Sequence, residues 1–251
     1  MKTLLRILVP SILMVLPIKA DTEDVINLAR SYLGSETALE AVKSVVYKGT
    51  LTSGGVNAAG EEVKTTAKIE IIFAKPFYQR IRITSPERTE TTGLDDYEAW
   101  QRIENPENAD QWRMTLLDTV QIRRLRANTW ENLNFFEGIS KIGGDVKDEG
   151  IVTVDGKRLH KLAFTHGYGI IFFRFYDPAT GKLVLSETDT GAKITESGES
   201  RIAGVRFPDQ VVTTSERADG STQRVEVNFE SVEVNSVLTK SIFRVPSITR
   251  Q

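Results

Sequence analysis

The sequence predicts a mainly β (α+β) fold, with a single antiparallel sheet of about 10–11 strands, a helix at its start and another helix inserted halfway. Three observations predict it. From Ser44 onward, apolar and polar residues alternate with the period of two that is typical of half-buried strands. Turn residues such as "SPERT", "VDGK" and "ADGST" separate these segments. Two other stretches repeat apolar residues every three or four positions, which indicates amphipathic helices.

The first helix is expected within residues 22–43, where one apolar stripe is formed by Val25, Ile26, Ala29, Tyr32 and Leu33. Gly34 interrupts it, and Ser35 can cap a second helical segment. The mid-chain helix is expected over residues 116–136, with a less regular apolar face: Leu117, Val120, Leu125, Trp130, Leu133 and Phe136. The stretch "GGDVKDEG" after it is expected to be a flexible loop.

The strands predict a curved sheet with an apolar concave face. Ile69, Ile71 and Phe73 share one face of "TTAKIEIIFAK", and Ile81 and Ile83 share one face of "FYQRIRIT". A sheet of this size twists and curls, so its concave face must be covered. The two amphipathic helices are the available cover, and any part that they leave open forms an apolar cavity.

The first twenty residues are predicted to be a secretory signal. Lys2 and Arg6 give a basic start, the short apolar run "ILVPSILMVLPI" follows, and Ala20 offers a cleavage point. The alternative is an uncleaved anchor, although the run is short for a membrane span and contains two prolines. Residues 21–251 are then expected to form a single domain, because no repeat or composition shift marks a boundary.

Composition excludes several classes of protein. The formal net charge is −2, so electrostatics favour neither nucleic acid nor an anionic membrane surface as a partner. The chain has no cysteine, which excludes disulfides, thiol catalysis, thiolate metal sites and an acylated cysteine after the signal. Together with the signal, this predicts a freely diffusing periplasmic protein without a metal or cofactor.

The stretch "GLDDYEAWQRIENP" raises the question of an active site, because paired acids beside aromatics are typical of sugar-cleaving enzymes. Asp95 and Asp96 are adjacent, however, so on a strand they would point to opposite faces, and Asp is common in turns. A turn is therefore favoured, and an envelope glycan hydrolase is the weaker alternative. Tyr97 and Trp100 differ by an odd number, so only one can face the concavity, and we expect it to be Trp100.

Two further patterns could carry function. His160 and His166 lie on one strand face, but no Asp or Glu on that strand completes a metal site, so polar strand ends are the favoured interpretation. In "QIRRLRAN", Arg123, Arg124 and Arg126 form either a solvated helix face or a docking patch for a phosphate headgroup or a partner protein.

The order of motifs resembles the LolA-like periplasmic outer-membrane lipoprotein carriers and lipoprotein-sorting proteins. In "AKPFYQRIRI" and "GLDDYEAWQRIENP" the matching residues are Lys75, Pro76, Phe77, Asp95, Trp100, Asn105 and Pro106. The resemblance covers residues 22–246 and implies an incomplete β-barrel with helices as a lid, holding acyl chains for binding and transfer rather than catalysis. LolA itself carries an arginine, tied to one-way hand-over of cargo, where this chain has Lys75. Lysine lacks the guanidinium fork, so Lys75 is a candidate hand-over residue without the intact LolA mechanism.

We therefore expect a soluble periplasmic carrier that binds acyl chains of a lipoprotein or lipid and transfers them toward the outer membrane. The expected partners are an inner-membrane donor and an outer-membrane acceptor. The alternative is a sensor or scaffold of the same fold that detects envelope lipoproteins and signals through a partner protein. The aromatic and aliphatic residues either form the core or line a cavity, and the expected lining is Phe73, Phe77, Ile81, Ile83, Trp100, Leu117, Val120, Trp130, Phe164 and Phe172.

Overall fold

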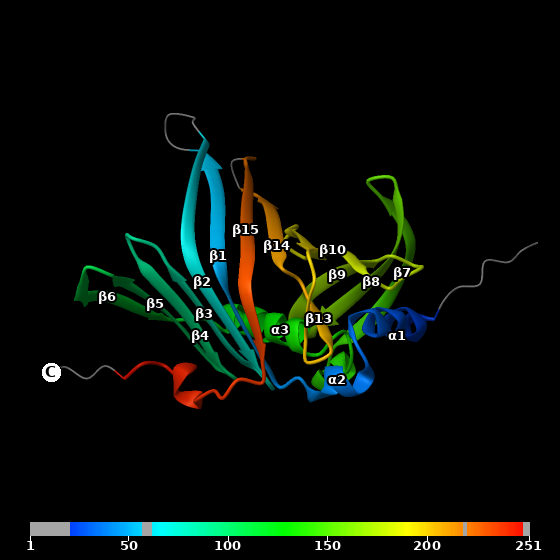
Figure 1. The fold of residues 1–251 in the computed structure, drawn as a ribbon, viewed down its shortest axis with the longest axis horizontal. Coiled ribbons are helices and arrows are strands. Elements are labelled where there is room, and N and C mark those ends of the chain that lie inside the picture. The colour runs from blue at the N-terminus through cyan, green and yellow to red at the C-terminus, as the bar shows by residue number, and fades with distance from the viewer. Residues whose placement is uncertain (1–20, 57–61, 218–219, 248–251) are drawn as a thin grey trace, which may run out of the picture.

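The computed structural model describes three stretches of the chain, residues 21–56, 62–217 and 220–247. One large antiparallel sheet bends around a central helix, α3 (Thr119–Leu133) (Figure 1). Two shorter helices follow the N-terminal end of the described chain: α1 (Thr22–Leu33) lies to the right of α3 in that view and α2 (Glu36–Ala41) lies below it. None of the helices in the described stretches is long and apolar enough to cross a membrane. The predicted signal at residues 1–20 lies outside the described residues.

The large sheet has 13 strands in the order β6-β5-β4-β3-β2-β1-β15-β14-β11-β10-β9-β8-β7, and β12 and β13 form a separate hairpin. The strands are β1 (Ser44–Val56), β2 (Glu62–Ala74), β3 (Tyr78–Thr84), β4 (Thr89–Asp95), β5 (Glu98–Asn105), β6 (Asn108–Leu116), β7 (Asp145–Val154), β8 (Lys157–His166), β9 (Ile170–Tyr176), β10 (Leu183–Thr188), β11 (Lys193–Ser197), β12 (Ser200–Ile202), β13 (Val205–Phe207), β14 (Gln210–Glu216) and β15 (Thr222–Val234). The sheet is not closed, because β6 and β7 are its two edges. The predicted incomplete barrel is confirmed, with more strands than the spacing suggested.

Strand β7 accounts for part of the difference in strand number. The stretch "GGDVKDEG" was expected to be a loop, but Asp145 already begins β7, which pairs with β8. Its residues alternate between exposed and half-buried along the whole strand. β7 is an edge strand, and charged side chains on an edge discourage pairing with other chains. Because its first half is hydrophilic, β7 lacks the apolar alternation that indicates a strand.

The predicted Ser35 cap is confirmed, and the mid-chain helix forms with a shifted start. Ser35 caps α2 by accepting a hydrogen bond from the Ala38 backbone N–H. Asp118 caps α3 through a capping box with Gln121, so the helix begins later than the expected residue 116. Three short 3₁₀ segments complete the described helices: η1 (Ile139–Ile142), η2 (Gly167–Gly169) and η3 (Lys240–Ile242).

Arg30 joins α1 to the end of α3. This arginine is 3% exposed, and its Nη1 donates hydrogen bonds to the backbone oxygens of Phe135 (2.9 Å) and Asn134 (3.3 Å). Its guanidinium also pairs with Glu36 and Glu137. Carbonyls after a helix C-terminus carry partial negative charge, so a buried arginine there satisfies them and fixes the angle between the helices.

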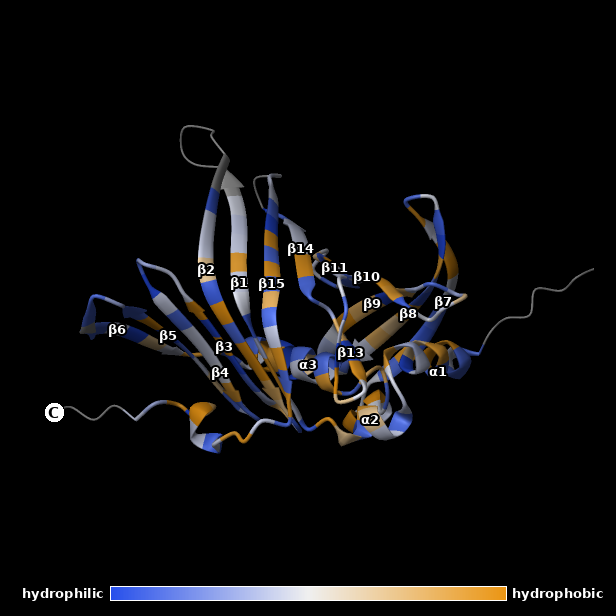
Figure 2. Ribbon diagram, in the orientation of Figure 1, coloured by the Kyte–Doolittle hydropathy of each residue, from blue (hydrophilic) through white to orange (hydrophobic). Residues whose placement is uncertain are grey.

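The two largest core clusters lie on the side of the sheet that faces the helices, and hydrophobic residues recur along the strands (Figure 2). One cluster packs α1 and α3 against β8 and β9 around Trp130, Phe164 and Phe172. A second packs α2 and β13 against β1 and β2 around Tyr47 and Phe73. α3 contributes to both clusters and therefore holds the two halves of the sheet together.

The opposite, outer face of the sheet is covered near its lower end by the C-terminal segment. Phe243 is 2% exposed and packs against Val46 and Ile72. Trp100 lies on this outer face, and its Nε1 donates a hydrogen bond of 2.9 Å to the Phe243 backbone oxygen. The expectation that Trp100 faces the concavity is therefore wrong. The cause is register, because Trp100 lies opposite Gly93, where the missing side chain leaves room for the indole.

Replacing Phe243 with alanine should lower the free energy of unfolding by about 3 kcal/mol, because it removes a buried ring from the outer-face cluster. Urea unfolding followed by tryptophan fluorescence measures the change, with Trp100 reporting locally. The matched control is Val237→Ala in the same segment, since Val237 is fully exposed and should leave stability unchanged. Equal stability of the two variants would contradict the role given to the C-terminal segment.

Candidate functional site

The inner face of the sheet is the face turned toward α3, and Gln79 identifies it. The Gln79 Oε1 accepts hydrogen bonds from Thr129 Oγ1 (3.1 Å) and Asn128 Nδ2 (3.2 Å) on α3. Gln79 lies opposite Phe73 on β2 and Leu94 on β4. Residues directly opposite in an antiparallel pair share a face, so every second residue along each strand belongs to the inner face.

Part of the inner face is apolar and only half-buried. Its side chains share the face of Gln79 by register, and none belongs to the buried core clusters. They are Leu51, Ile81, Ile83, Ile103, Val211 and Val225. We call these residues the open apolar face. One polar pair lies among them, in which Gln101 Nε2 donates to Glu90 Oε1 over 2.9 Å. The helices thus leave an apolar surface inside the curve of the sheet that is partly accessible to solvent.

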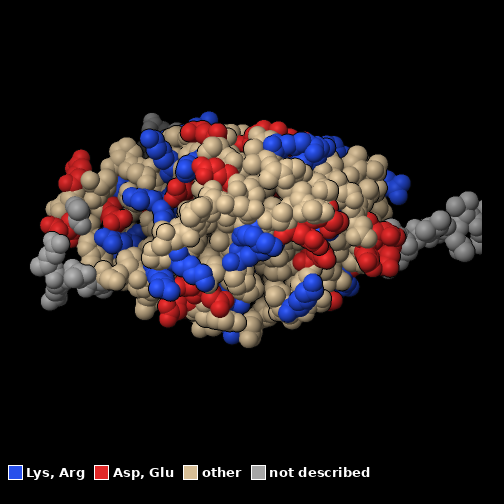
Figure 3. Space-filling view, turned by 60° about the horizontal axis from the view of Figure 1, so that its bottom comes forward, with Lys and Arg blue, Asp and Glu red and all other residues tan. Residues whose placement is uncertain are grey.

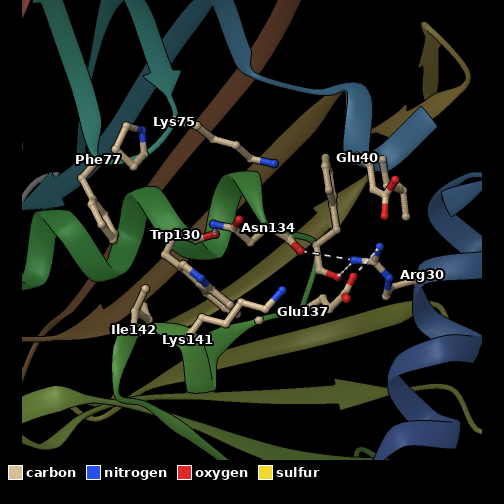
Figure 4. Close-up of a pocket in the computed structure, with 13 residues that line it drawn as sticks. Arg30, Glu40, Lys75, Phe77, Trp130, Asn134, Glu137, Lys141 and Ile142 are labelled. Atoms are coloured by element: carbon tan, nitrogen blue, oxygen red, sulfur yellow. Dashed lines mark hydrogen bonds and ion pairs between the residues drawn. The ribbon is translucent and has the colours of Figure 1, made fainter. Parts of the chain in front are cut away.

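A pocket of about 360 Å³ lies where the ends of α1, α3 and β2 meet. Phe77 and Trp130 form its apolar wall, and Lys75, Lys141 and Glu137 supply charge (Figure 4). We call it the lysine pocket. It combines a mainly carbon lining with ammonium groups at its edge, an arrangement that suits a molecule with an apolar body and a polar end.

The surroundings of Lys75 disfavour the charged form of its side chain. Burial lowers the pKa of Lys75 below its usual range, and the positive charges of Lys43 and Arg30 lower it further, while Glu137 and Glu40 act in the opposite direction. The side chain is half-buried and forms no ion pair within the described residues. A partly desolvated ammonium group at a pocket edge is a candidate ligand-binding group.

Replacing Lys75 with methionine should slightly raise the free energy of unfolding, by less than about 1 kcal/mol because water still reaches the side chain. The folded-state pKa is depressed, so the charged form costs stability at neutral pH, and this cost fades as pH rises toward the usual lysine range. Thermal unfolding of both proteins at neutral and alkaline pH measures the effect. A Met variant that is less stable at neutral pH would contradict it, and Lys68→Met, at an exposed position on β2, is the control.

A buried ionic cluster fixes α3 to the sheet beside these surfaces. The Glu131 side chain is 1% exposed; its Oε1 lies 2.7 Å from His166 Nε2, and its Oε2 accepts hydrogen bonds from Arg174 Nη2 (2.6 Å) and Nε (3.1 Å). Arg174 also donates to Ser186 Oγ over 2.6 Å. The sequence interpretation missed this cluster, although one signal existed, since Arg174 interrupts the otherwise apolar strand "IIFFRFY".

The histidines are buried, although His166 is a strand end as expected, being the last residue of β8. His160 and His166 are 6% and 5% exposed, and each meets one carboxylate from another element. His160 Nε2 lies 2.8 Å from Asp148 Oδ1 on β7, and His166 meets Glu131 on α3. No group of three or more His, Asp or Glu able to hold a metal occurs among the described residues.

The structure places four of the ten predicted lining residues, and the predicted hand-over residue Lys75, at these two surfaces. Ile81 and Ile83 lie on the open apolar face by register. Phe77, Trp130 and Lys75 line the lysine pocket. Residues quoted from separate motifs thus meet at two neighbouring places on the inner side of the sheet.

The other predicted residues lie elsewhere. Phe73, Phe164 and Phe172 are 4%, 0% and 8% exposed and belong to the core clusters, which means that they support the fold. Leu117 is half-buried and precedes α3, because Asp118 caps the helix after it. Val120, in the first turn of α3, is 59% exposed.

The acidic pair forms the β4–β5 turn, as the turn interpretation predicted. Asp96 has a left-handed φ of 56°. Its backbone oxygen accepts a hydrogen bond from Arg126 Nη1, and its carboxylate forms an ion pair with the same arginine. The Asp95 carboxylate lies 3.6 Å from Arg244 Nε. Each acid has its own arginine, so the two carboxylates do not share a proton or a common substrate position. Tyr97 follows them and is 70% exposed.

No protein-family model matches the chain, and no curated protein matches its sequence. Solved structures do match its fold. A LolA superfamily protein from Nitrosomonas europaea is 11% identical with a TM-score of 0.54, and the match covers 86% of this chain and 97% of that one. A putative outer membrane lipoprotein-sorting protein domain from Vibrio parahaemolyticus is 11% identical, with a TM-score of 0.55 and coverage of 89% and 97%.

A DUF1329 family protein from Desulfovibrio piger is also similar, with 12% identity, a TM-score of 0.53 and coverage of 88% and 96%. At these identities the likeness shows the fold. The resemblance that the motif order indicated is therefore confirmed at the level of architecture. The chain has the LolA-like fold.

Proposed function

We propose that residues 21–251 act as one lipid-binding domain, which after export holds the acyl chains of a lipid or lipoprotein on the open apolar face and carries them through the periplasm toward the outer membrane. The open apolar face carries this proposal, because Ile81, Ile83 and Ile103 stay half-buried inside a curved sheet. An acyl chain laid there gains about 0.8 kcal/mol for each methylene that leaves water. Contiguous accessible apolar surface in a soluble protein commonly marks a binding site.

The fold supports the same function. A LolA superfamily protein and a lipoprotein-sorting domain share this architecture, which fits lipoprotein or lipid cargo for this chain as well. We propose binding and transfer rather than catalysis, since Asp95 and Asp96 each have an arginine partner and form a turn. Lys75 is proposed to contact the polar end of the cargo at the lysine pocket during hand-over to an acceptor.

The experiment that tests this function is mass spectrometry of organic extracts from the protein purified out of its native envelope. A co-purifying lipid or acylated peptide is expected, together with displacement of a fluorescent acyl probe by that molecule. Absence of both would overturn the proposal. A second assay follows movement of the lipid from donor vesicles to acceptor vesicles. A carrier accelerates this movement alone, whereas an output that needs a second protein would favour a sensor of the same fold.

A further inference from the structure

A second pocket, of about 400 Å³, lies beside the N-terminal half of α3. α3 contributes Arg123 and Arg126, the β4–β5 turn contributes Tyr97, and η2 contributes Tyr168. Phe77 lines both this pocket and the lysine pocket, so the two are neighbours. We call the second one the arginine pocket.

Both arginines are stacked on aromatic rings. The Arg123 Cζ lies 3.2 Å from the centroid of the Tyr168 ring. The Arg126 Cζ lies 3.9 Å from the ring of Tyr97 and 3.8 Å from the ring of Phe77. Stacking holds the guanidinium plane in place while its N–H groups point outward from the edge. A pre-oriented guanidinium of this kind is ready to bind a planar or tetrahedral oxyanion.

The three arginines of "QIRRLRAN" have different partners. Arg124 is held away from the pocket by two hydrogen bonds to Asp189, of 2.9 and 2.8 Å. Arg126 donates to the backbone oxygen of Asp96 over 3.1 Å and pairs with its carboxylate. Arg123 has no hydrogen bond or ion pair with any described residue, and its guanidinium stacks on the Tyr168 ring. The described part of the chain thus leaves one oriented guanidinium without an anion.

Within the described residues the pocket lining contains no Asp or Glu, and the Asp96 carboxylate that pairs with Arg126 is not part of it. The lower face of the molecule as a whole carries basic and acidic groups side by side (Figure 3). The uncompensated charge of Arg123 is therefore a local feature and does not come from a generally basic surface. Ile122, Ala127 and Ile142 add an apolar floor beside it.

The tyrosine over Arg123 is held in an unusual conformation. Tyr168 is 78% exposed and has a left-handed φ of 70° between two glycines. Such backbone is sparsely populated for a tyrosine, and strain of this kind gathers at binding sites. In this conformation the ring stacks on Arg123 at the surface.

We propose that the arginine pocket binds a phosphate ester, with Arg123 as the main anion ligand and Arg126 as the second, and that the ester is the headgroup of a phospholipid-type cargo. The guanidinium edge of Arg123 matches phosphate oxygens, and Arg126 adds the N–H groups of its Nη2 and Nε, since Asp96 holds its Nη1. The apolar floor suits the carbon part of the headgroup. The choice of a lipid as the source rests on the proposed function, whereas the anion site does not.

Calorimetric titration of the purified chain with three soluble probes tests this. Dihexanoyl phosphatidylglycerol carries phosphate and short acyl chains, glycerol phosphate carries phosphate alone, and dihexanoylglycerol carries the chains alone. Arg123→Gln should weaken both phosphate probes by at least about tenfold. Arg124→Gln, whose guanidinium faces Asp189, should change them by less than about twofold. Arg123→Lys keeps the charge without the fork and should fall between them.

The outcomes separate the site from the proposed function. Unchanged phosphate binding in Arg123→Gln, with the fold intact by circular dichroism, would overturn the site. Glycerol phosphate that binds as tightly as the phospholipid would keep the site but overturn the lipid as its source. If dihexanoylglycerol and acyl probes do not bind while glycerol phosphate still depends on Arg123, then the carrier function fails and the anion site stands.

Discussion

Replacing Glu131 with alanine should lower the free energy of unfolding by about 3–5 kcal/mol, the largest stability effect that we expect from a single change. Within the described stretches Glu131 is the one carboxylate that contacts both Arg174 and His166, and its side chain is 1% exposed. Its removal leaves the Arg174 guanidinium buried with Ser186 as its remaining side-chain hydrogen-bond partner. The penalty comes from an uncompensated buried charge, and it falls on the contact between α3 and the sheet.

Two further variants make this prediction specific. Adding Arg174→Met to Glu131→Ala should recover part of the lost stability, because the buried charge is then gone as well. Glu233→Ala breaks a pair with Lys48 in which both side chains are about half exposed, and its stability should match that of the parent. Denaturant unfolding of the parent, Glu131→Ala, Arg174→Met, the double variant and Glu233→Ala measures these effects. A double variant as unstable as the sum of its single changes would contradict a coupled cluster.

Replacing Ile81 with glutamate should weaken acyl-probe binding by at least about tenfold, which corresponds to about 1.4 kcal/mol. Ile81 is half-buried on the open apolar face, so in the free protein the new carboxylate can reach water and the fold survives. A bound acyl chain would strip that water away, and an unpaired charge without water is strongly disfavoured. Probe fluorescence titration measures the dissociation constant, and Ile83→Glu should behave in the same way.

The matched control lies on the same strand. Thr84 points to the outer face by alternation, so Thr84→Glu adds the same charge to β3 without entering the open apolar face. Probe affinity in this variant should equal that of the parent. A similar loss in Ile81→Glu and Thr84→Glu would mean that added charge, and not its place on the inner face, weakens binding.

Local patterns predicted the fold well because they act over short distances. Alternation identified β2 and β3, and the Ser35 cap and the α1 stripe followed from helix periodicity. The acidic turn was recognised because Asp is a turn residue and adjacent strand residues diverge. Edge strand β7 was not predicted, because charged residues replace much of its apolar alternation. Charged side chains on an edge strand discourage pairing with other chains.

The site was harder to predict because its residues meet through long-range register. Trp100 was expected inside the curve, but it lies opposite Gly93 on the outer face and bonds to Phe243, 143 positions away in sequence. Tyr97 instead flanks the arginine pocket through Arg126. Such contacts join segments whose pairing depends on the whole sheet, and residue spacing within one strand carries no information about them.

Photo-crosslinking with a fatty acid that carries a diazirine near its chain end tests the central claim most directly, because it reports where an acyl chain lies. After irradiation and peptide mapping, we predict labels on inner-face residues of the open apolar face, with Ile81 and Ile83 among them and Ile81→Glu reducing the yield. Labels concentrated on the outer face, around Trp100 and Phe243, or no labelling that excess unlabelled fatty acid can suppress, would contradict the claim.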